Sequence, residues 1–249
     1  MVMNNLVKKF LFMLVAVPML AVASGEEVRL DRAPINLKDV ISLQRGAKYF
    51  VNYCLNCHSA SSMRYSRLQD LGLTEQQIKD NLMFTAEKIG DTMTTVLDPK
   101  DSKDWYGSPP ADLSVIARSR SPDWLYTYLR TFYRDDTSPS GWNNETFRNV
   151  AMPHVQYELQ GILVMQKVGE RKGHDGVTEP VMKLVLDKPG SMSPRDYDQM
   201  VGDLVNYLVY MGEPAQVQRI QIGIIALFFL GILFVIALLL KREYWKDVK

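Results

Sequence analysis

The chain has 249 residues and a formal net charge of +1 at pH 7, and it contains two cysteines and three histidines. With two cysteines, a structural zinc site would need histidines to complete its four ligands. Residues 24–218 carry 22 lysines and arginines against 26 aspartates and glutamates, a net charge of −4. This mildly acidic balance argues against nucleic-acid binding and suits a basic partner protein; the alternative is that it serves only solubility.

The N-terminus has the pattern of a secretory signal peptide. Lys8 and Lys9 precede the apolar run 10–22, and Ala21-Val22-Ala23 forms a small-x-small cleavage site. We predict that residues 1–23 are a signal peptide; the alternative is an uncleaved membrane anchor. Residues 24–218 would then form one exported domain, which is long enough for a substantial core.

The first predicted helix leads into a haem-attachment motif. Residues 37–53 are expected to be helical, because Asp39 or Ser42 can cap the helix and apolar residues recur at helical spacing at Leu43, Ala47 and Phe50. Next comes Cys54-Leu55-Asn56-Cys57-His58, the spacing of a c-type haem site. Cysteines three apart share one helix face, so both thiols can bond the vinyl groups of one haem, with His58 as an axial ligand.

Three other interpretations of this motif are a thioredoxin-like redox pair, half of a zinc site and a structural disulfide. A redox pair does not require the histidine. A zinc site would have to recruit His154 and His174 as well as His58. A disulfide across so short a loop would restrain the unfolded chain little. Cys54, Cys57 and His58 therefore favour one covalent haem c.

The middle of the chain is predicted to be mainly helical. Helices are expected over 74–83, over a short segment that Asp112 caps, and over 121–133, where Ser121 is the cap and a proline opens the first turn. The aromatic residues of the third helix predict core packing and part of a porphyrin-facing wall. Residues 134–153 have few periodic apolar residues and are predicted to form a long loop.

A hairpin, a helix and a membrane anchor are predicted to complete the chain. Apolar runs at 162–167 and 181–186, with glycines between them, predict a small β-hairpin with a long tip. Ser193 and Pro194 open a helix that is expected to end before Gly212. The 19 residues 222–240 carry no charge and would span about 28 Å as a helix. We therefore assign 219–242 to a transmembrane helix and 243–249, with its lysines, to a cytoplasmic tail.

The second axial ligand has four candidates. A haem that only carries electrons is usually six-coordinate, and a thioether opposite a histidine raises its potential. Met152 and Met192 lead because each lies in a turn-rich stretch, and the proline after Met152 keeps it out of helical geometry. His154 and His174 are alternatives that would give bis-histidine ligation.

Two arginines are candidates to pair with the haem propionates. Arg118 and Arg120 lie just before the predicted aromatic helix. Propionates in a partly buried pocket require cationic or hydrogen-bonding partners. The alternative is that both are solvated surface residues.

Several motifs, in the same order along the chain, resemble those of the cytochrome c1 family: Cys54-Leu55-Asn56-Cys57-His58, Pro109-Pro110-Ala111-Asp112-Leu113-Ser114, Ala117-Arg118-Ser119-Arg120 and Ala151-Met152-Pro153, with a single C-terminal anchor. The resemblance implies a mainly α, cytochrome c-like haem domain with long loops, a small β-hairpin and one C-terminal transmembrane helix. It also implies that Met152 is the distal ligand, that Arg120 meets a propionate, and that Pro109 and Pro110 line the haem edge. Many members of that family have two glycines where this chain has Ser121-Pro122.

The resemblance further implies a subunit of the ubiquinol:cytochrome c oxidoreductase, or cytochrome bc1 complex, in a bacterial inner membrane, with its haem domain in the periplasm. Its haem c would take one electron from a Rieske iron-sulfur protein and reduce a soluble cytochrome c. Cytochrome b and membrane lipid are further expected partners, and the complex is expected to be dimeric. No substrate bond is made or broken on this chain, so no catalytic residue is expected.

Asp135, Asp136 and Glu145 are a candidate docking patch for a basic partner; solvated charges are the alternative. Two other functions fit parts of the sequence. One is a free-standing, membrane-anchored cytochrome c that serves a terminal oxidase. The other is a haem-free periplasmic thiol oxidoreductase that uses Cys54 and Cys57.

Overall fold

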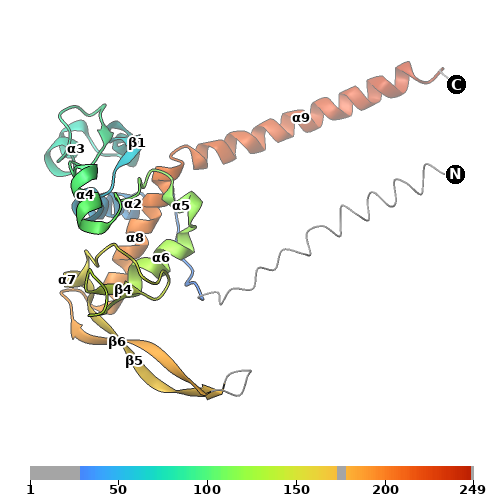
Figure 1. Ribbon diagram of the computed structural model, residues 1–249. Helices are drawn as coiled ribbons and strands as arrows, with labels where there is room; N and C mark the ends of the chain where they lie inside the picture. Colours follow the sequence, from blue (N-terminus) through green and yellow to red (C-terminus); the bar gives the residue numbers. More distant parts are fainter. Residues whose placement is uncertain (1–28, 173–177, 248–249) are drawn as a thin grey trace.

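Helix α8 (Pro194–Gly212) forms the centre of the domain in a computed structural model that describes residues 29–172 and 178–247. Elements from the first half of the chain lie mostly toward its C-terminal end, and a long hairpin leaves from its N-terminal end (Figure 1). The predicted signal peptide, residues 1–23, and the candidate ligand His174 lie outside the described residues. Ser193 caps α8, because its side chain accepts a hydrogen bond from Asp196 N, as the Ser-Pro start predicts.

Helix α2 (Val40–Tyr49) crosses α8 at very short range. Asp39 caps α2 by accepting a hydrogen bond from Ser42 N, which confirms the predicted start signal. The crossing requires a glycine: a Cβ on Gly46 would lie 2.1 Å from the carbonyl oxygen of Asp203. The Asp203 side chain also forms an ion pair with Arg45, with a Nε–Oδ2 distance of 2.6 Å. Close contact between the two backbones thus fixes α2, and with it the segment that follows.

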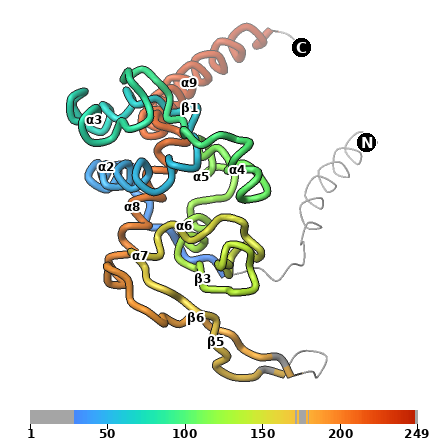
Figure 2. The backbone as a smooth tube through the Cα atoms, turned by 60° about the vertical axis from the view of Figure 1, so that its left-hand side comes forward, coloured from blue at the N-terminus to red at the C-terminus, as the bar shows by residue number. Residues whose placement is uncertain are grey.

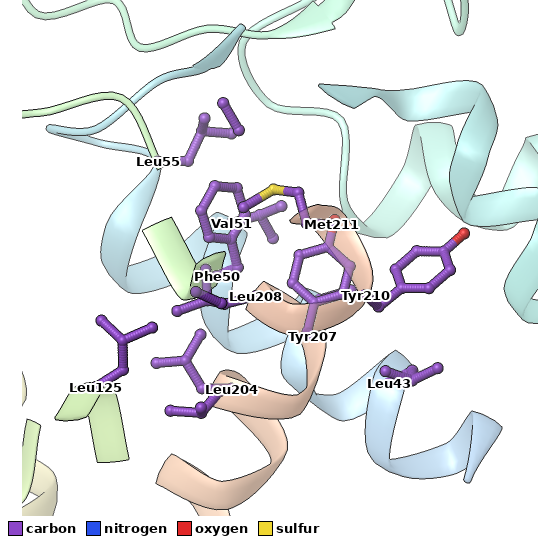
Figure 3. Close-up of a cluster of buried hydrophobic side chains, with 14 of the residues drawn as sticks. Leu43, Phe50, Val51, Leu55, Leu125, Leu204, Tyr207, Leu208, Tyr210 and Met211 are labelled. Carbon is purple, nitrogen blue, oxygen red and sulfur yellow. The ribbon is translucent and has the colours of Figure 1, made fainter. Parts of the chain in front are cut away.

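The core lies between α2, α8 and helix α6 (Pro122–Arg130). After α2 the chain widens into a π-helical turn, η2 (Phe50–Cys54), which buries Phe50 and Val51. The ring of Phe50 packs against Tyr207 of α8 at a centroid distance of 5.7 Å. Figure 3 shows side chains from all these segments in contact, including Phe50, Val51, Leu125, Leu204, Tyr207 and Leu208. The predicted stripe of Leu43, Ala47 and Phe50 is confirmed, since each is 2% exposed or less.

The segment after the haem motif forms a lobe of short elements at the C-terminal end of α8. Strand β1 (Ala60–Arg64) pairs antiparallel with β2 (Thr92–Met93). Between them lie the 3₁₀-helix η3 (Tyr65–Leu71) and helix α3 (Glu75–Asn81), which Thr74 opens with a capping box. Helix α4 (Pro99–Tyr106) follows and leads to the two prolines of the predicted site. The predicted helix over 74–83 is confirmed, with slightly shorter bounds.

Three predictions in the middle of the chain were wrong. Helix α5 (Ile116–Ser119) begins after Val115, which provides no side-chain cap, so Asp112 does not cap it. Helix α6 ends at Arg130 instead of continuing to 133. Residues 132 and 133 instead belong to strand β3 (Phe132–Arg134), which pairs with β4 (Trp142–Asn144). Strand β4 lies inside segment 134–153, which was predicted to be a loop. Aromatic and β-branched residues suit strands as well as helix cores, so the aromatic run did not mark the helix end.

The predicted hairpin is confirmed and is longer than expected. After the short helix α7 (Tyr157–Gln160), strand β5 (Gly161–Lys172) pairs antiparallel with β6 (Thr178–Pro189). Figures 1 and 2 both show it projecting from the domain. The tip, residues 173–177, lies outside the described residues.

Helix α9 (Gln216–Tyr244) follows α8 after three residues. It is long and apolar enough to cross a membrane. It extends away from the rest of the molecule in both views (Figures 1 and 2). It includes the predicted transmembrane segment 219–242, although it starts three residues earlier and ends two residues later.

Candidate haem site

All the predicted haem-binding residues line one cavity. The cavity has a volume of about 390 Å³ and lies between η2, the α4–α5 segment, α6, residues 147–155 and α8. Its wall is largely apolar, as is typical of a cofactor site. Seven of the lining residues are those predicted from the sequence: Cys54, Cys57, His58, Pro109, Pro110, Arg120 and Met152.

The haem motif continues the turn that η2 begins. The amides of Cys57 and His58 donate to the carbonyl oxygen of Cys54 at 3.1 and 2.8 Å. One helical turn therefore sets both cysteines on the same side, facing the cavity, as the sequence predicts. Their thiols are free.

The thiols do not have the properties of a redox pair. Burial, together with the neighbouring Cys57, raises the pKa of Cys54 to about 12. Burial also raises the pKa of Cys57. A thiol oxidoreductase needs a lowered pKa, because the thiolate is its nucleophile. The cavity therefore disfavours the thiol oxidoreductase interpretation.

The surroundings of His58 leave its Nε2 free to bind a metal. Its Nδ1 lies 2.7 Å from the carbonyl oxygen of Ala111. A carbonyl only accepts, so Nδ1 carries the hydrogen and Nε2 keeps a free lone pair. Burial lowers the pKa of His58 and so favours the neutral imidazole that metals bind.

Asp112 fixes the segment that holds His58. Its carboxylate accepts hydrogen bonds from Ser61 N at 2.9 Å, Ser61 Oγ at 2.6 Å and Ser114 N at 2.8 Å. The two bonds from Ser61 attach residues 109–113 to β1, next to the carbonyl of Ala111, and the bond from Ser114 N stabilises the turn that follows Asp112. The sequence pattern predicted a helix cap at Asp112 and did not reveal this role, because Ser61 is 51 positions away in the chain.

Replacing Asp112 with alanine is expected to lower the free energy of unfolding by about 1–2 kcal/mol, because three hydrogen bonds to a partly exposed carboxylate are lost. Urea unfolding of the purified chain measures the change. Asp80→Ala, on the exposed surface of α3, is the control and should change stability by less than about 0.5 kcal/mol. Equal midpoints for the two variants would contradict this role of Asp112.

Met152 lines the cavity, and its competitors lie elsewhere. Among the described residues, Met152 is the only methionine and His58 the only histidine in the wall. His154 is 3% exposed and stacks on Phe132, with ring centroids 5.0 Å apart. Burial lowers the pKa of His154 to about 4. Met192 packs against the hydrophobic core.

Arg118 and Arg120, which were equal candidates for a propionate partner from the sequence, have different surroundings. The Arg120 guanidinium lies over the rings of Trp124 and Phe147, 5.1 and 5.8 Å from their centroids. This places it in the cavity wall. The side chain of Arg118 instead packs close to Gly212 at the end of α8. Only Arg120 is therefore placed to meet an anion in the cavity.

Ser121 turns the chain sharply between Arg120 and α6. Its φ is +78°, a region that favours glycine and costs other residues about 1–3 kcal/mol. Its hydroxyl offsets part of this cost, because it accepts a hydrogen bond from Trp124 N and caps α6. A serine thus occupies a backbone conformation that favours glycine.

Two carboxylates of the predicted docking patch already bind side chains nearby in the sequence. Asp135 accepts hydrogen bonds from Thr137 and Asn143, and these bonds lower the pKa of its carboxyl. Asp136 pairs with Arg134 at 3.0 Å. Asp135 thus organises the connection between β3 and β4, and a docking role for the patch remains a prediction.

The donor set fits a six-coordinate c-type haem. The wall offers two adjacent thiols, an imidazole with a free Nε2, a thioether and one arginine, among apolar side chains. Within residues 29–172 and 178–247 no three His, Cys, Asp or Glu side chains come together to hold a metal ion, so the zinc interpretation finds no ligand set there. Sequence reasoning missed Leu204 and Leu208, which line the cavity from α8; their i, i+4 spacing is the signal that could have found them.

Comparison with known proteins gives consistent matches over most of the chain. The sequence model of the cytochrome c1 family matches residues 32–248. The chain is 48% identical over 245 residues to the ammonia monooxygenase gamma subunit of Nitrosomonas europaea, with 98% of this chain and 99% of the relative covered. It is 49% identical over 239 residues to cytochrome c1 of Allochromatium vinosum, covering 95% and 96% of the two chains. It is also 30% identical over 240 residues to cytochrome c1 of Rhodospirillum rubrum, with 85% and 83% covered.

Proposed function

The chain belongs to the cytochrome c1 family of electron-transfer haem proteins, and from that premise we propose that its cavity holds one haem c bonded to Cys54 and Cys57. His58 and Met152 would be the axial ligands. The observation that carries this proposal is that all the required donors line one cavity. When bound, haem c supplies a one-electron carrier.

The chain's own residues hold, orient and shield this carrier. Cys54 and Cys57 would hold the haem by covalent bonds, and the hydrogen bond between His58 and Ala111 sets the orientation of the imidazole. The apolar wall excludes water, and together with the Met152 thioether it favours the reduced state and a high potential. Arg120 offers a cation at the wall for a propionate.

We further propose that this chain works in a quinol:cytochrome c oxidoreductase with cytochrome b and a Rieske protein. It would take one electron from the Rieske centre and pass it to a soluble cytochrome c. The names of two of the relatives support this assignment, and the net charge of −4 over residues 24–218 suits a basic acceptor. Helix α9 would anchor the domain in the inner membrane of a bacterium, with the C-terminus in the cytoplasm and the complex as a dimer.

One relative suggests a second candidate function, because it is named as a subunit of ammonia monooxygenase. A haem that activates oxygen needs an open coordination position. The cavity offers donors for both axial positions, His58 and Met152. The site therefore favours electron transfer for this chain.

Isolation of the native complex tests the proposed function. Mild detergent extraction through a C-terminal tag should recover cytochrome b and a Rieske protein together with a c-type haem that added quinol reduces. A haem-loaded chain isolated alone would support the free-standing cytochrome instead. Ammonia-dependent oxygen uptake by the isolated complex would support the monooxygenase.

Arg120→Gln is expected to lower the reduction potential by roughly 20–70 mV, because loss of a positive charge near the iron favours the oxidised state. A redox titration of the purified, full-length chain measures the shift. Arg118→Gln removes the same charge beside α8 and should change the potential much less. A larger shift in potential for Arg118→Gln than for Arg120→Gln would contradict the proposal that Arg120 is the propionate partner.

A further inference from the structure

The hydroxyl group of Tyr128 donates a hydrogen bond to the sulfur of Met152. The distance from Oη to Sδ is 3.5 Å. Both side chains line the cavity, Tyr128 from α6 and Met152 from the segment after β4. A thioether sulfur has two lone pairs and is a weak acceptor, so it can accept this bond and still have one lone pair for a metal.

The protein holds Tyr128 firmly in this orientation. The ring stacks on Trp124 at a centroid distance of 4.7 Å and meets Phe132 edge-on at 5.0 Å. The carbonyl of Tyr128 accepts a 2.7 Å hydrogen bond from Asn144 Nδ2, which belongs to a fully buried side chain. Contacts on the backbone and with two neighbouring aromatic rings therefore aim the hydroxyl at the sulfur before any cofactor enters.

We propose that Tyr128 is a positioning residue for Met152: its hydrogen bond directs the sulfur and reduces the electron density that the sulfur donates to iron. The inference rests on the proposed function, in which Met152 is an axial ligand. The oxidised iron depends more on this donation than the reduced iron does. The bond therefore raises the reduction potential, in the same direction as the apolar wall.

Tyr128→Phe in the full-length, haem-loaded chain tests the inference. The variant keeps the ring contacts and removes the hydroxyl. Haem should stay attached and the reduction potential should fall. The oxidised protein should bind added imidazole about 2- to 10-fold more weakly, because the sulfur now competes better for iron by roughly the net strength of one hydrogen bond.

Tyr126→Phe is the matched control. It removes a hydroxyl from the same helix, but Tyr126 lies two residues away, on nearly the opposite face, where its ring packs against the Arg130 guanidinium at 4.4 Å. The reduction potential and the imidazole affinity of the Tyr126→Phe variant should match those of the unaltered chain. The same shifts in both variants would overturn the inference.

Two outcomes separate this inference from the proposed function. Unchanged potential and imidazole affinity in haem-loaded Tyr128→Phe would overturn the role of Tyr128 and leave the function standing. An unaltered chain without attached haem would overturn the function itself. If the variant does not mature, NMR of the reduced, unaltered chain decides: a slowly exchanging Tyr128 hydroxyl proton next to the Met152 methyl group supports the bond, and its absence contradicts it.

Discussion

Replacing Met152 with leucine is expected to lower the reduction potential by on the order of 0.1 V or more, while haem stays covalently attached. Leucine fills a similar volume and has no lone pair, so the iron loses its sulfur ligand and the oxidised state is stabilised relative to the reduced state. Redox titration measures the shift. Loss of the iron–sulfur absorption band in the oxidised protein identifies its cause.

Met192→Leu is the matched control, because Met192 packs against the hydrophobic core and does not line the cavity. It should leave both the potential and the sulfur band unchanged. If Met152→Leu left them unchanged and Met192→Leu altered them, the ligand assignment would be wrong. The chain around residues 152–154 would then have no direct role at the iron.

Gly46→Ala is expected to lower the free energy of unfolding by about 3 kcal/mol or more. The new methyl group would lie 2.1 Å from the backbone oxygen of Asp203 and 2.6 Å from the Cβ of Tyr207. Neither atom can move without α8. Helix α2 would have to shift away, breaking the ion pair of Arg45 with Asp203 and displacing the turn that carries Cys54.

The matched control for this change is Gly90→Ala, since a Cβ at Gly90 meets open space. It should leave the stability unchanged or raise it by up to about 1 kcal/mol. Thermal unfolding and the yield of haem-loaded chain should separate the two variants clearly. Similar midpoints would contradict the close helix crossing.

Local signals predicted the elements that depend on local chemistry. The caps at Asp39, Thr74, Ser121 and Ser193 are each formed by a side chain and an amide a few residues apart. Helix starts can therefore be recognised from short stretches of sequence. The end of α6 could not be recognised in this way, because Phe132 and Tyr133 are compatible with a helix or a strand. Pairing with β4 places these two residues in a strand.

Sequence motifs predicted the residues of the candidate site but did not predict the hydrogen bonds that hold those residues in place. Cys54, Cys57 and His58 are adjacent in sequence, so their spacing alone indicates the chemistry. The bonds of Asp112 to Ser61 and of Tyr128 to Met152 join residues that are 51 and 24 positions apart. Such contacts depend on how the elements pack, which residue spacing in a single sequence does not reveal.

Intact mass spectrometry of the denatured, alkylated chain tests the central claim most directly. Covalent attachment at Cys54 and Cys57 predicts a mass increased by one haem, with neither cysteine alkylated, and fragmentation should locate the haem on residues 54–58. A chain of unmodified mass with two alkylated cysteines would contradict it.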